Sequence, residues 1–165
     1  MAPTAPYLAI AGAVLVLGAT SLTDPFGRDQ GTYAYIGYAL LQGQVPYLDV
    51  FQAKPPLTSL IHALALALFG HSMTAIRVLD LLWTLATAIL LYRVAAIALR
   101  HDGLALVAAL AYLLMYYAFG FWDTAITDGW TNLPALAGIA FFARAVAPEG
   151  AARRRHIDWY LAGLC

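Results

Sequence analysis

The feature that most constrains this chain is a run of 20 residues, Gly103 to Trp122, that contains no charged side chain. A helix of this length is long enough to cross the hydrocarbon core of a bilayer. The composition agrees, because 62% of the residues are hydrophobic and only 11% are charged, against about 25% in soluble domains. A soluble domain with so few charges would expose large apolar patches. We therefore predict an all-α, polytopic transmembrane protein.

Other segments share this apolar character. We predict spans at about 5–22, 75–99, 103–122 and 131–147, and the start of another at 157–165. No Lys or Arg precedes the first of these, which favours an uncleaved span over a signal peptide. The chain ends inside the last apolar run, so we interpret residues 1–165 as one unit, the N-terminal part of a larger transmembrane domain.

Residues 23–74 form a more polar stretch between the first two predicted spans. Tyr33, Ile36 and Leu40 recur at helical spacing, and Gly43 suits the end of a helix. The following segment, Leu57 to Phe69, is apolar but has only 13 residues, a length more typical of an interfacial helix than of a span. We therefore predict a first outer loop that contains juxtamembrane helices.

The charges of the chain exclude some partners but leave the orientation open. Nine basic and nine acidic residues cancel, which argues against a nucleic-acid partner. Two orientations remain. In the first, the N-terminus is cytoplasmic and Leu57 to Phe69 does not cross the membrane. In the second, the N-terminus is outside and this segment crosses. The bias of Lys and Arg among the loops slightly favours the second.

Several short blocks follow one another along the chain. Between Asp24 and Leu57 they are Asp29-Gln30-Gly31-Thr32-Tyr33, Leu40 to Gly43, Pro46 to Asp49 and Lys54 to Leu57. Arg77 opens the second predicted span, and Asp128 follows the third. In order and spacing, these blocks resemble the polyprenyl-phosphate-dependent glycosyltransferases of the GT-C fold. They are most similar to the protein O-mannosyltransferase and lipid A aminoarabinose transferase group.

Two positions depart from the pattern of that group. Gln30 stands where the family has a second acidic residue, and Ala53 stands where the aminoarabinose enzymes often have a glutamate linked to metal binding. We assign no metal ligand, and a divalent metal ion is left open as a cofactor. The resemblance also implies that both acidic loops lie outside and that Leu57 to Phe69 is juxtamembrane, so we adopt the first orientation.

The resemblance implies a cell-envelope enzyme, integral to the bacterial cytoplasmic membrane, with an extracytoplasmic active site. It would transfer a sugar, with inversion, from a polyprenyl-phosphate donor to a hydroxyl of a lipid, glycan or protein acceptor. A carboxylate can take the proton of that hydroxyl, and cations stabilise the leaving phosphate. The candidate residues are Asp29 as base, Asp128 as a second catalytic carboxylate, and Lys54, Arg77, Tyr33 and Asp49 as substrate-binding residues.

Each candidate also has a structural interpretation. The alternatives are helix capping for Asp29 and Asp128, loop ordering for Asp49, membrane anchoring for Lys54 and pairing of Arg77 with Asp80. The competing function is that of a transporter or channel fragment, in which ionisable groups tend to lie inside the spans. Here most acidic residues lie in two loops, which favours the enzyme. We expect the isolated fragment to be inactive.

Overall fold

The computed structural model describes residues 4–51, 53–120, 122–146 and 155–165, and this part of the chain is helical without any extended strand. The helices in chain order are α1 (Ala5–Gly18), the 3₁₀ helix η1 (Ala19–Thr23), α2 (Arg28–Leu41), α3 (Pro56–Phe69), α4 (Met73–Leu99), α5 (Asp102–Ala118), α6 (Thr127–Val146) and α7 (Arg155–Leu164). The predicted all-α class is confirmed.

The helices that can cross a membrane follow from length and hydropathy. Two described segments, Ala5–Thr23 and Met73–Leu99, are long and apolar enough, while α3 and α5 are shorter apolar helices. Helix α5 ends earlier than the predicted span because Gly120 follows it with φ +74°, a conformation that suits glycine. Membrane crossing by α5 and α6 remains a prediction.

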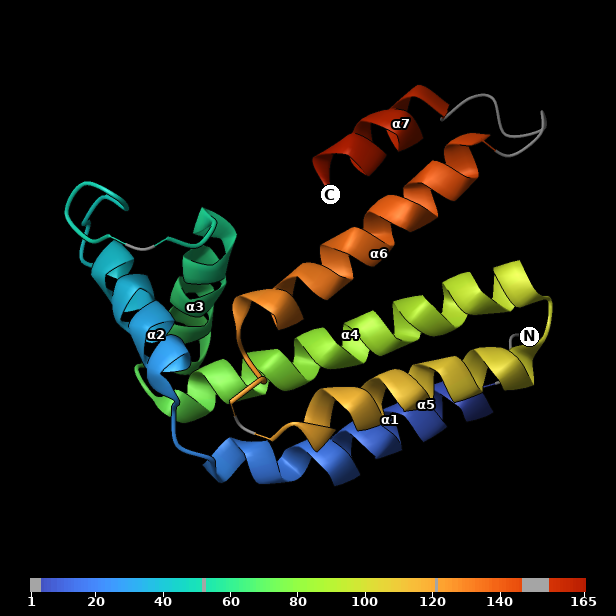
Figure 1. Ribbon diagram of the computed structural model, residues 1–165, viewed down its shortest axis with the longest axis horizontal. Helices are drawn as coiled ribbons and strands as arrows, with labels where there is room; N and C mark the ends of the chain where they lie inside the picture. Colours follow the sequence, from blue (N-terminus) through green and yellow to red (C-terminus); the bar gives the residue numbers. More distant parts are fainter. Residues whose placement is uncertain (1–3, 52, 121, 147–154) are drawn as a thin grey trace.

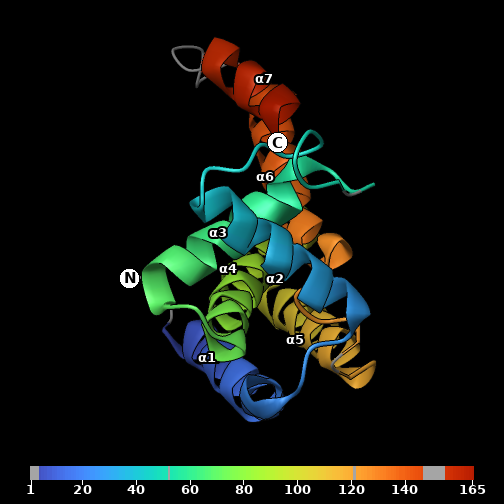
Figure 2. The ribbon, with the colours of Figure 1, turned by 90° about the vertical axis from the view of Figure 1, so that its left-hand side faces the viewer.

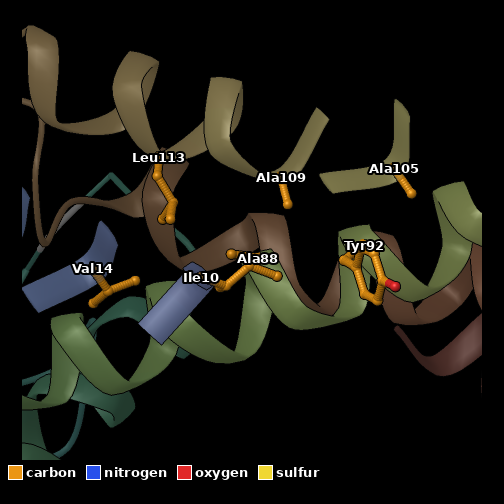
Figure 3. Packing of buried hydrophobic residues seen from close by; sticks show 7 residues of the cluster. All are labelled: Ile10, Val14, Ala88, Tyr92, Ala105, Ala109 and Leu113. Carbon is orange, nitrogen blue, oxygen red and sulfur yellow. The ribbon is translucent and has the colours of Figure 1, made fainter. Parts of the chain in front are cut away.

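Helices α1, α4 and α5 lie side by side and form a bundle (Figure 1, Figure 2). Figure 3 shows the buried cluster between them, formed by Ile10, Val14, Ala88, Tyr92, Ala105, Ala109 and Leu113. Its three alanines are 0% exposed, whereas Val16 and Ile97 on the outside are 78% and 80% exposed. Small side chains inside and large apolar ones outside are expected of helices that pack within lipid.

Helices α2 and α3 pack on each other at one end of this bundle, where η1 ends and α4 begins (Figure 1). They approach closely at Gly37, where a Cβ atom would lie 2.8 Å from the backbone nitrogen of Ala63. The connection between α5 and α6 reaches the same end, and α7 packs back on α6 (Figure 1). We refer to residues 24–41, 56–69 and 122–130 together as the end layer.

Candidate functional site

Two connections that are far apart in sequence are joined inside the end layer. The Gln30 side chain donates from Nε2 to the carbonyl oxygens of Trp122 (3.2 Å) and Thr124 (2.8 Å). Arg77 of α4 donates to the hydroxyl of Thr124 (2.6 Å) and to the carbonyl oxygen of Pro25 (3.1 Å). Gln30 and Arg77 are both 0% exposed. The segment before α2 and the segment before α6 are therefore held as one unit.

Asp80 fixes the next residue of the second connection. Its Oδ1 accepts hydrogen bonds from the backbone N–H of Ala125 (3.1 Å) and from the hydroxyl of Tyr116 (2.6 Å). Ala125 is buried and has φ +54°, a left-handed conformation that is uncommon outside glycine. In the described part of the chain, no ion pair joins Arg77 to Asp80. Instead, Arg77 binds Thr124 and Asp80 binds the next residue, Ala125.

Asp29 is the second residue of α2 and points its carboxylate to the surface. Its side chain is 59% exposed, and its charged neighbour is Arg28, with Nε 3.8 Å from Oδ1. With Arg28 and Trp122 it lines a depression of about 300 Å³. The N–H of Gly27, which precedes the helix, is bound by Gln30 Oε1 at 2.7 Å. The capping contact at this helix end thus comes from Gln30, which leaves the Asp29 carboxylate accessible.

Asp128 is also the second residue of its helix, α6, and is exposed. It lines a different depression, of about 390 Å³, together with Asp123 and the aromatic side chains of Tyr112 and Tyr116. Trp122 lines the Asp29 depression, so the 122–127 connection lies between the two. The structure brings the two carboxylates to the same end of the molecule but into separate depressions.

Lys54 and Asp49 lie in the connection between α2 and α3, and both are exposed. Asp49 Oδ2 accepts from the backbone N–H of Val45 (2.8 Å), which orders this loop. The hydroxyl of Tyr47 donates to the carbonyl oxygen of Lys54 (2.8 Å), so the backbone of this exposed residue is held in place. No hydrogen bond or ion pair between described residues joins either side chain to Asp29.

Tyr33 lies inside the end layer, next to the buried histidine of α3. Its ring packs edge-on against His62 at 5.7 Å, and His62 packs against Trp130 at 5.8 Å. His62 Nδ1 lies 2.8 Å from the carbonyl oxygen of Thr58, one turn earlier. Burial lowers the pKa of His62 from 6.5 to about 4, so the ring is neutral at neutral pH. Tyr33 therefore contributes packing between α2, α3 and α6.

The N-terminal turns of α2 and α3 each contact the chain around the start of α6, at different points. Gln30 links α2 to the segment just before α6, and Thr58 of α3 lies 3.2 Å from Thr127 of α6 between the two hydroxyl oxygens. A helix N-terminus carries partial positive charge and unpaired N–H groups, which favour anions such as phosphate. Arg77 adds a buried positive charge beside Thr124, in the segment just before α6.

The described residues contain no group of three or more His, Cys, Asp or Glu side chains placed to hold a metal ion. The divalent ion that the sequence left open is therefore assigned to no residue.

Sequence reasoning missed the connecting roles of Gln30, Asp80 and Tyr116. In the sequence, Gln30 stands out only as a departure from a family pattern. A Gln three residues after the N-cap position is, however, typical of a capping box. Asp80 stood out as a carboxylate inside a predicted span, where such a group usually has a specific partner. Neither signal identifies Trp122, Thr124 or Ala125 as the partner, since these lie 45 or more residues away in sequence.

Comparison with known proteins places the chain in a family. A family model described as dolichyl-phosphate-mannose-protein mannosyltransferase matches residues 53–165, which is well over half of the chain and includes Lys54, Arg77 and Asp128. Asp29 and Gln30 precede the match. No curated protein and no solved structure matches the chain. The chain therefore belongs to the dolichyl-phosphate-mannose-protein mannosyltransferase family, which consists of membrane glycosyltransferases of the GT-C type.

Proposed function

We propose that this chain forms part of the catalytic centre of an enzyme that transfers a sugar from a polyprenyl-phosphate donor to an acceptor hydroxyl. The acceptor belongs to a lipid, a glycan or a protein, and the reaction takes place on the extracytoplasmic face of the bacterial cytoplasmic membrane. One observation supports this most strongly: the exposed Asp29 carboxylate lies in the first turn of α2, next to Gln30, whose buried side chain binds the segment just before α6.

In this proposal Asp29 is the general base. The acceptor oxygen attacks the anomeric carbon from the face opposite the phosphate, while the Asp29 carboxylate takes its proton. The bond between the anomeric carbon and the phosphate oxygen breaks, the configuration inverts, and the polyprenyl phosphate leaves with the electron pair. Asp128 assists as a second carboxylate. The position of its exposed side chain at the same end of the molecule supports this assignment.

The leaving phosphate needs positive charge. Lys54 is exposed and can reach a bound donor directly, with Asp49 beside it in the same loop. Arg77 and Tyr33 are buried, so they act from beneath the surface, Arg77 through its charge and Tyr33 through packing. Charges and helix N-termini in a partly water-excluded site stabilise a developing phosphate charge strongly. We expect residues 1–165 alone to be inactive.

The test is turnover of Asp29→Asn in the full-length protein, reconstituted in liposomes with a polyprenyl-phosphate sugar. Asparagine keeps the shape of the side chain but cannot take a proton at neutral pH, so we expect the rate to fall about 10²–10⁴-fold. The initial rate is measured against donor concentration, and the donor KM should change less than about twofold, because the phosphate contacts are untouched.

Asp102→Asn serves as the matched control, because Asp102 is an exposed carboxylate in the first turn of α5. This variant should keep wild-type turnover. Near-wild-type turnover of Asp29→Asn would overturn the assignment of Asp29 as base.

A further inference from the structure

Gln30 is a fully buried amide whose hydrogen bonds run in two directions. Its oxygen accepts from the N–H of Gly27 at 2.7 Å. Its nitrogen donates to the carbonyl oxygens of Trp122 and Thr124, 92 and 94 residues away in the chain. Trp122 also lines the depression that contains Asp29. The amide therefore connects the turn that carries Asp29 to a second segment that lines the same depression.

The chemistry of these partners favours an amide over a carboxylate. A carboxylate could accept from Gly27 but has no N–H to offer to the two carbonyl oxygens. Three oxygen acceptors would then face one another in a buried place, where an unpaired charge is costly. An acidic residue at this position would not fit the contacts made here.

We propose that Gln30 is a positioning residue that holds Asp29 in place by tying the first turn of α2 to the 122–124 segment. This inference rests on the proposed function, in which Asp29 is the base. Position 30 takes no proton in the reaction, and Asp29 works as the single carboxylate of this turn. The role depends on the two N–H groups of the amide. A substitution that removes these groups but keeps the length of the side chain therefore tests it.

The experiment compares Gln30→Met and Gln30→Glu in the full-length protein in liposomes. Methionine has a similar length but no N–H donor, so kcat should fall about 10²-fold at every pH, the size of effect that a small misplacement of a catalytic group causes. The donor KM should change less than about twofold, because the phosphate contacts are not altered.

Glutamate should give a pH signature that a purely structural role does not give. Its carboxylate form repels the two carbonyl oxygens, but its protonated form can donate one O–H bond to them. Burial favours the protonated form. The ratio of Gln30→Glu to wild-type kcat should therefore rise as the pH falls. Gln42→Glu, an exposed change at the other end of the same helix, should match wild type at every pH.

Hydrogen exchange of residues 122–127 gives a readout that does not depend on the reaction. We expect faster exchange of this segment in Gln30→Met and unchanged exchange in Gln42→Glu. Unchanged exchange in Gln30→Met would overturn the tie between the two connections, whatever the role of Asp29. Faster exchange with wild-type kcat would overturn the positioning role, and a pH-independent ratio for Gln30→Glu would overturn the part played by the N–H groups. Full turnover of Asp29→Asn would instead refute the proposed function.

Discussion

Helices α1, α4 and α5 contact one another through apolar side chains, three of them alanine, whereas the end layer adds buried polar side chains to an apolar cluster of its own. In the bundle, Ala88, Ala105 and Ala109 allow close approach (Figure 3). In the end layer, backbone groups of the 122–125 segment are bound directly by Gln30 and by Asp80 of the adjoining α4. Both regions exclude solvent, but they do so with different chemistry.

The difference matches what each region has to do. Packing of small residues fixes how closely helices approach in lipid, where apolar burial gives no driving force between helices. Hydrogen bonds are directional, so a buried and well-paired network specifies the position of each group it includes. The polar network lies beside Asp29 and Asp128, where the position of a side chain affects the reaction. The bundle has to fix only how closely its helices pack. Three stability measurements test this contrast.

The largest effect is expected for Asp80→Leu. This change removes the acceptor of the Ala125 N–H and of the Tyr116 hydroxyl, and it takes a buried negative charge away from the buried Arg77 guanidinium. Breaking a buried charged network typically costs about 3–5 kcal/mol. The free energy of unfolding in detergent micelles should fall by that amount. Asp123→Asn, an exposed change on the same connection, should cost less than about 1 kcal/mol.

The next effect is a pH dependence that comes from His62. Its pKa is about 6.5 when unfolded and about 4 in the folded protein because burial disfavours the charged ring. The unfolded state then binds the proton more strongly, so stability is lost as the pH falls from 6.5 to about 4, by about 3 kcal/mol. We expect His62→Gln to lose correspondingly less stability over this interval.

His71→Gln is the control for this measurement, since His71 is exposed. Its stability should follow the wild-type pH curve. If His62→Gln followed that curve as well, His62 would not be the group responsible.

The smallest of the three effects concerns the bundle. Ala109 is fully buried between α5 and its neighbours, so Ala109→Leu inserts methylene groups where there is no space. Overpacking of this kind typically costs about 1–3 kcal/mol, measured as the change in unfolding free energy in micelles. Val107→Leu on the exposed side of the same helix should be close to neutral. Equal effects at both positions would mean that close packing does not hold the bundle.

The helical segments could be predicted from the sequence because hydropathy acts locally. Long apolar runs mark α1 and α4, and the short run after Pro56 marks α3. Helix ends were less predictable. The helical spacing from Tyr33 onward gives no start for α2, which begins at Arg28, where Gln30 binds the N–H of Gly27.

The arrangement of the site could be predicted only in part. The sequence singles out Asp29, Lys54 and Asp128 by residue type, and all three are exposed. It does not reveal that Arg77 binds Thr124 instead of pairing with Asp80, because these contacts depend on how connections distant in sequence meet. Local spacing suggests the i, i+3 partner on the same helix, but the fold offers each side chain a nearer backbone or hydroxyl group.

The central claim is that the connections before α2 and before α6 lie on one side of the membrane, the extracytoplasmic side, and together form the site. Single cysteines at Thr32 and Thr131, both exposed, test it in the full-length protein with Cys165 replaced. A thiol reagent that cannot cross membranes is applied to intact cells and again after permeabilisation. The account predicts that both positions are labelled in intact cells, whereas labelling of one position only before permeabilisation would contradict it.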